Sequence, residues 1–202
     1  MKLPDNYSTL PESDGSGGKI QPPPDSYVCR VIRVKFQLSK SARPMLVFDF
    51  DIAEGPFSKF FSDDNDDRAA KNFEPRWLRL YQLVDGKAAS VFKGLLKNFE
   101  RSNDGYSVEQ HTVGEEFDEK SLEGKLIGLV CAGEEYQYND QIRMSLKPDR
   151  SLPVEKVRAR DVPEARIKGV DGAWRKASEP PPPATKPGTN ELSDVSDVDI
   201  PF

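Results

Sequence analysis

Residues 26–52 read SYVCRVIRVKFQLSKSARPMLVFDFDI, and this stretch decides the fold. Its first part, 27–36, is rich in β-branched side chains and partly alternates apolar with polar residues, which predicts a strand. A polar turn follows, and 45–52 predicts a second strand that returns beside the first. Successive side chains of a strand point to opposite faces, so one apolar row is expected to face the core. That row consists of Leu46, Phe48, Phe50 and Ile52.

Four further patterns follow along the chain. Residues 75–81 alternate in polarity and predict a strand, although their spacing also fits a helix. Residues 87–101 place apolar side chains at steps of three and four, which predicts an amphipathic helix. Residues 122–132 predict an apolar strand and 141–147 an alternating one, and a polar tip at 134–140 is expected to join them.

These elements predict a mainly β fold with two hairpins, a strand between them and one helix before the last hairpin. That order is typical of a five-stranded OB-fold-like barrel, whose strand face and hairpin loops commonly hold oligonucleotides. The predicted organisation is a flexible arm at 1–25, an OB-like domain at 26–160, a connecting segment at 161–176, and a disordered Pro-rich linker with an acidic tip at 177–202.

The composition excludes several classes of protein. Of the 202 residues, 36% are hydrophobic and 31% are charged, which is enough apolar material for one core. No apolar run reaches the length of a membrane span, and no signal peptide is visible, so the protein is expected in the cytoplasm, or in the host cytoplasm if a phage encodes it. Cys29 and Cys131 lack the spacing of a zinc or redox motif, and both are expected to be buried.

The net charge of −5 is unevenly distributed. Residues 177–202 contain one cation, Lys186, and five acids, whereas the rest of the chain is nearly neutral. Such asymmetry indicates a detached tail with a partner of its own.

The chain ends in the residues SDVDIPF, behind a spacer with four consecutive prolines at 180–183. This ending resembles the C-terminal tip of bacterial and phage single-stranded DNA-binding proteins (SSBs), in which a linker joins an OB-fold to an acidic tip ending in Asp-Ile-Pro-Phe. The resemblance implies that the tip binds replication, recombination or repair proteins. A free carboxylate, an aromatic ring and nearby acids also suit a small apolar pocket rimmed by Lys or Arg. The candidate partner-binding residues are Asp197, Asp199, Ile200, Pro201 and Phe202.

The body of the chain is similar to small replication-module proteins of phages and mobile elements in four short stretches, 44–46, 51–55, 92–94 and 100–103. Together with the tip, this similarity implies an SSB of phage or mobile-element type. Self-association is left open by the sequence.

Proteins hold single-stranded DNA without sequence preference through cations that follow the phosphates and aromatic rings that stack on bases. The chain offers both on outward strand faces and at hairpin turns. The same cations also fit plain solvated faces, and Trp77 also fits the core. The candidate DNA-binding residues are Arg33, Lys35, Lys40, Arg43, Trp77, Arg79, Tyr81, Tyr136, Tyr138, Arg143 and Lys147.

Two acidic groups offer alternative chemistry. Asp49 and Asp51 share a strand face near Glu54, and paired carboxylates of this kind could hold a metal ion for phosphodiester cleavage. The acidic run 63–67 is spaced like part of an EF-hand loop, but Arg68 stands where the sharp turn needs glycine, so we interpret the run as an exposed loop.

We therefore expect a non-enzymatic protein without a cofactor or a metal that binds single-stranded DNA. No Walker or GxGxxG loop occurs, and His111 has no partner set for a catalytic triad. The second hypothesis is a protein-interaction adaptor without DNA binding, and the third is a metal-dependent nuclease.

Overall fold

The computed structural model describes residues 20–139 and 141–180. The strands are β1 (Ser26–Leu38), β2 (Pro44–Ile52), β3 (Leu78–Leu83), β4 (Thr112–Val113), β5 (Glu116–Phe117), β6 (Leu126–Tyr138), β7 (Gln141–Leu152), β8 (Arg166–Lys168) and β9 (Trp174–Lys176). The α-helices are α1 (Phe60–Ala69), α2 (Ala89–Ser102) and α3 (Val154–Arg158), and the 3-10 turns are η2 (Gly86–Ala88), η3 (Glu109–His111) and η4 (Glu119–Leu122). The fold is mainly β, with three α-helices in the described residues where the sequence predicted one.

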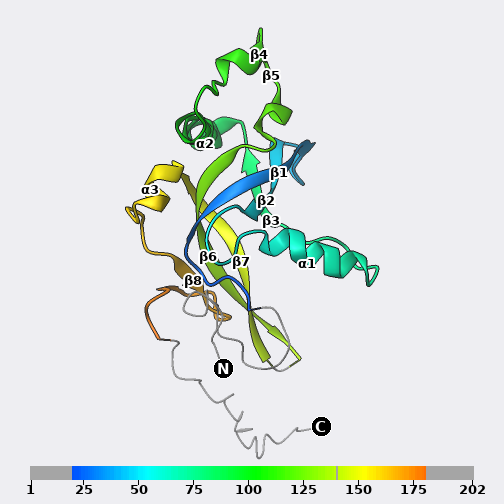
Figure 1. The fold of residues 1–202 in the computed structure, drawn as a ribbon, viewed down its shortest axis with the longest axis vertical. Helices are drawn as coiled ribbons and strands as arrows, with labels where there is room; N and C mark the ends of the chain where they lie inside the picture. The colour runs from blue at the N-terminus through cyan, green and yellow to red at the C-terminus, as the bar shows by residue number, and fades with distance from the viewer. Residues whose placement is uncertain (1–19, 140, 181–202) are drawn as a thin grey trace, which may run out of the picture.

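One large mixed sheet organises the described residues (Figure 1). Its strand order is β3-β2-β1-β6-β8-β9, and β7 pairs with β6. All pairs are antiparallel except β6 with β8. β4 and β5 form a separate small ribbon. β3 and β7 lie near each other, but no backbone ladder joins them in the described part of the chain, which therefore forms an open sheet.

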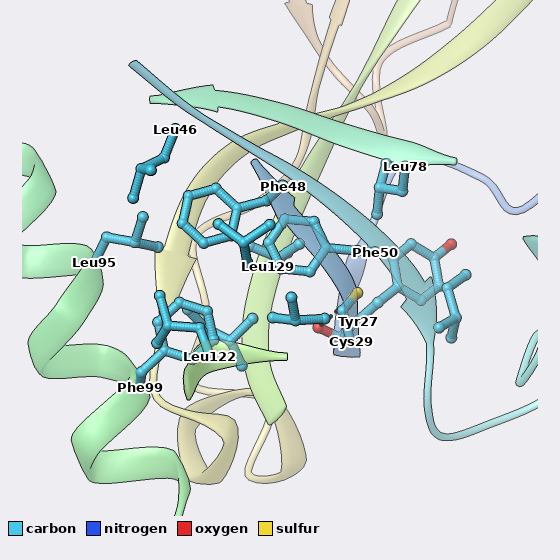
Figure 2. Packing of buried hydrophobic residues seen from close by; sticks show 14 of the residues in the cluster. Tyr27, Cys29, Leu46, Phe48, Phe50, Leu78, Leu95, Phe99, Leu122 and Leu129 are labelled. Carbon is cyan, nitrogen blue, oxygen red and sulfur yellow. Dashed lines mark hydrogen bonds between the residues drawn. The ribbon is translucent and has the colours of Figure 1, made fainter. Parts of the chain in front are cut away.

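The core lies between the sheet and α2, and the apolar row predicted on the second strand is confirmed. Leu46, Phe48, Phe50 and Ile52 are all buried in one cluster. The rings of Phe48 and Phe50 stack with centroids 5.7 Å apart, and Phe48 also stacks on Phe99 of α2. Figure 2 shows Phe99 and Leu95 pointing from α2 toward this row.

The predicted amphipathic helix is confirmed as α2, which buries Leu95 and Phe99. Asn103 ends the helix and ties it to the sheet. Its side-chain amide donates to the carbonyl of Phe99 and to that of Leu126, at 2.8 Å each, and the amide N–H of Leu126 donates back to the Asn103 side chain at 2.9 Å. The end of α2 is therefore fixed to the start of β6.

The interpretation of 63–67 as an exposed loop is wrong, because these residues lie within α1. Asp51, which is buried, accepts hydrogen bonds from the backbone N–H groups of Phe61 and Ser62 at 3.0 and 3.1 Å. These donors belong to the first turn of α1, which has no intrahelical acceptors for them. A carboxylate from β2 thus caps the helix, and it also stabilises the positive end of the helix dipole.

The last hairpin is longer than predicted. Residues 134–138, expected as a polar tip, belong to β6, and their pairing with β7 continues to Tyr138 and Gln141.

The strand expected at 75–81 is confirmed as β3, although its bounds are shifted and Trp77 precedes it. The helical alternative for this segment is wrong.

Residues 161–176, expected as a connecting segment, contain β8 and β9. β8 pairs with β6, and Ile167 of β8 is buried.

Both cysteines are buried, as predicted, and burial raises the pKa of each thiol.

None of the helices in residues 20–139 and 141–180 combines the length and apolar character that a bilayer crossing requires.

Candidate nucleic-acid interface

Four of the predicted DNA-binding residues share the outward face of β1, β2 and β3, which we call the sheet face: Arg33, Lys35, Arg79 and Tyr81. The strand register brings them together. Arg33 pairs with Asp49, which pairs with Arg79, and Lys35 pairs with Val47, which pairs with Tyr81. Side chains at paired positions lie on the same side of a sheet. One row therefore holds Arg33 and Arg79 on either side of Asp49, and the next holds Lys35 and Tyr81, whose side chain is 57% exposed.

Asp49 positions the two arginines of the sheet face. Its side chain is 3% exposed, and each carboxylate oxygen accepts from a different guanidinium. Arg33 Nε lies 3.0 Å from Oδ2, and Arg79 Nε lies 2.6 Å from Oδ1. The hydrogen bond to Asp49 raises the pKa of Arg79. These bonds use only part of the five N–H donors of each guanidinium, and the arginine side chains are 42% and 39% exposed, so phosphate oxygens could accept from the remaining donors.

A groove of about 420 Å³ lies beside the sheet face. It collects two of the predicted aromatic residues, Trp77 and Tyr136, which come from distant parts of the sequence, and Arg79 joins them. The remaining lining residues are Gln21, Pro22, Phe60, Phe61, Asp64, Pro75, Arg76, Met144, Ser145 and Leu146. Aromatic and cationic groups in one open groove match the requirements for stacking bases and neutralising phosphates.

The outer side of the β6–β7 hairpin, which we call the hairpin face, carries four of the predicted residues: Tyr136, Tyr138, Arg143 and Lys147. Tyr136 pairs with Arg143, and the Arg143 guanidinium lies 4.5 Å from the centroid of the Tyr138 ring. Lys147 pairs with the carboxylate of Glu134. Tyr136 and Tyr138 are 40% and 50% exposed, so neither ring fills the core.

The structure does not bring Lys40 and Arg43 to these surfaces. Both lie in the β1–β2 turn, where Arg43 Nε donates to Asp85 Oδ1 at 3.0 Å. Asp85 immediately precedes η2 and α2, so Arg43 joins the turn to the helix. Lys40 is exposed there. The five candidate residues of the tip, Asp197, Asp199, Ile200, Pro201 and Phe202, lie outside the described residues.

The carboxylates that suggested a nuclease are committed to other partners. Asp49 binds two arginines, and Asp51 binds the first turn of α1. Glu54 pairs with Arg158 of α3, whose hydrogen bond lowers the pKa of Glu54. In the part of the chain that the structure describes, no group of three or more His, Cys, Asp or Glu could hold a metal ion.

Asp51→Ala is expected to destabilise the protein by about 2–3 kcal/mol, because it removes a buried carboxylate and leaves the partly buried N–H groups of Phe61 and Ser62 without their acceptor. The free energy of unfolding in urea measures the effect. Asp63→Ala is the matched control, since Asp63 is an exposed acid in the first turn of the same helix. Equal losses in the two variants would show that Asp51 acts only through its charge.

Sequence reasoning missed several residues that the structure places beside the predicted ones. Phe60 and Phe61 of α1 line the groove, as does Arg76, whose backbone N–H donates to the side chain of Asn65 in α1 at 2.6 Å. The sequence of α1 shows no apolar periodicity that would have predicted the helix. Trp174 is 51% exposed on β9. Its hairpin had a visible signal: two short alternating segments flank a turn that contains Gly169 and Gly172.

Comparison of the chain with protein-family models and with curated proteins found no match.

Proposed function

We propose that this protein binds single-stranded DNA without sequence preference and has no enzymatic activity. One observation carries the proposal: the sheet face and the groove, which share Arg79, combine oriented arginines with exposed aromatic rings. Arg79 belongs to both, since it pairs with Asp49 and lines the groove with Trp77 and Tyr136. Cations that follow the backbone and rings that accept any base give affinity without sequence readout.

The strand order supports an OB-type barrel as the scaffold of this surface. β1, β2 and β3 form a meander, α2 follows, and β6 and β7 complete the set, with β6 beside β1 and β7 near β3. In OB-folds the strand face and the loops beside it bind oligonucleotides. The sheet face and the hairpin face occupy the corresponding places.

A gel-shift with labelled single-stranded and duplex DNA, each with and without Mg²⁺, tests the proposal on the full chain. We expect a shift of single strands that weakens as salt rises, because the Lys and Arg side chains that contact phosphates release counterions from the DNA. Equal affinity for duplex DNA would contradict the proposal. Absence of any shift would favour the adaptor hypothesis, and Mg²⁺-dependent shortening of the DNA would favour the nuclease.

We further propose that the tip recruits replication, recombination or repair enzymes in the cytoplasm, as in phage-type SSBs. Phe202→Ala is expected to abolish capture of these partners in a pull-down, because the ring fills their apolar pocket. DNA binding should stay unchanged, since every acid of the tail is retained. Val198→Ala is the matched control, and partner capture by the Phe202→Ala protein equal to that of wild type would refute this role.

A further inference from the structure

The C-terminal hairpin, β8 and β9 with their turn (Arg166–Lys176), extends the hairpin face sideways. Glu134 of β6 pairs with Lys168 of β8, and Lys168 pairs with Trp174 of β9. The three side chains therefore lie on one side of the sheet. Their contacts agree with this register: Lys168 Nζ lies 3.5 Å from Glu134 Oε1, and the Arg166 guanidinium lies 4.6 Å from the centroid of the Trp174 ring.

Trp174 is not needed to hold this hairpin on the sheet. Ile167 is buried beneath it, and Arg175 pairs with Glu135 of β6, where the side chains are only 15% and 14% exposed. Trp174 points to the opposite side from Arg175 because the two are adjacent in a strand. About half of the Trp174 side chain is therefore exposed to water. The Arg166 guanidinium lies over its ring, and the exposed part of the ring is available to stack on a base.

The charge around Trp174 favours a polyanion. Two acids on this face share four cations: Glu134 pairs with Lys147 and Lys168, and Asp149 pairs with Arg150 and Arg166. Arg143, over the ring of Tyr138, adds a fifth cation. The surface around the exposed rings therefore has an excess of positive charge, although the whole chain is acidic.

This surface is continuous with the groove. Tyr136 lines the groove and lies two positions along β6 from Glu134, on the same side of the strand. Trp174 stands two strands away from Glu134, which corresponds to roughly 10 Å. A strand of DNA leaving the groove at Tyr136 would reach Trp174 over a short path flanked by Lys168 and Arg166.

We propose that the C-terminal hairpin is a second contact surface for single-stranded DNA, with Trp174 as its stacking residue and Arg166 and Lys168 as its phosphate contacts. This inference rests on the proposed function, and it assigns a role to residues 166–176. With this second surface, the path of the bound DNA extends beyond the groove. Only an oligonucleotide that is longer than the groove should therefore gain affinity from the C-terminal hairpin.

Binding of oligothymidylates of about 8 and about 30 nucleotides tests the proposal, since OB-type sites hold about 4 to 16 nucleotides. In fluorescence anisotropy with the full chain, Trp174→Ala should weaken binding of the longer strand by roughly 5- to 100-fold and leave the shorter one unchanged. Val170→Ala, in the turn of the same hairpin and also exposed, is the control. Equal affinities of Trp174→Ala and wild type for the longer strand would overturn the proposal and leave the proposed function intact. Failure of wild type to bind either strand would overturn both.

Tryptophan fluorescence gives a second readout, because Trp77 and Trp174 are the two tryptophans of the chain. In a Trp77→Phe protein, addition of the longer strand should quench the emission of Trp174, since stacking on a base brings the ring into direct contact with it. Bound DNA without quenching would refute the stacking role. A change in sedimentation of Trp174→Ala with unchanged DNA affinity would also refute it, and would instead identify the face as a contact between copies of the chain.

Discussion

Trp77→Ala combined with Tyr136→Ala is expected to weaken binding of single-stranded DNA by about 2–5 kcal/mol, a loss of roughly 30- to 4,000-fold. The two rings line one groove with Arg79, and each stacked base contributes about 1–3 kcal/mol. Equilibrium titration of a labelled oligothymidylate at fixed salt measures the loss.

Phe73→Ala is the control for this pair. Phe73 is 58% exposed, lies close to Trp77 in the sequence and does not line the groove. Unfolding in urea should be followed alongside, because Trp77 is half-buried. If affinity per folded molecule is unchanged in the double variant while stability falls, both rings are structural and the groove is not the DNA site.

Arg33→Ala combined with Arg79→Ala is expected to destabilise the protein by about 3 kcal/mol and also to weaken DNA binding. The side chain of Asp49 is 3% exposed and loses both guanidinium partners in this variant. A buried carboxylate without a partner typically costs 3–5 kcal/mol. The low end applies because the arginine side chains are 42% and 39% exposed, so the pairs are partly screened by solvent.

A third substitution separates the two effects of this variant. Adding Asp49→Asn removes the buried charge and should restore most of the free energy of unfolding, while the phosphate contacts stay absent and DNA affinity stays low. Recovery of affinity together with stability would mean that the arginines serve only to neutralise Asp49. Lys93→Ala is the control, since Lys93 is an exposed cation of α2 and is not one of the candidate DNA-binding residues.

The periodicity of apolar residues predicted those elements of the fold in which apolar residues recur every two to four positions. The alternation in 45–52 identified the core row, and the spacing in 87–101 identified α2, because the apolar side chains that a strand or a helix packs against the core recur with the period of that element. The same alternation placed Arg33 with Lys35, and Tyr136 with Tyr138, on common faces. The tip motif and the acidic tail were also read from the sequence, and their role stays a prediction.

Only the tertiary structure decided how these faces meet. α1 has no apolar face, and its start depends on Asp51, ten positions upstream in β2, so local patterns favoured a loop. The sequence suggested that Asp49 could be one ligand of a metal site. In the structure its carboxylate pairs instead with Arg33 and Arg79, which come from the two neighbouring strands. The groove unites Trp77 with Tyr136, and β8 reaches the sheet through a parallel pairing with β6. Contacts between distant segments produce no periodic pattern in the sequence. They depend on the shape, charge and hydrogen-bonding groups of surfaces that exist only after the chain has folded.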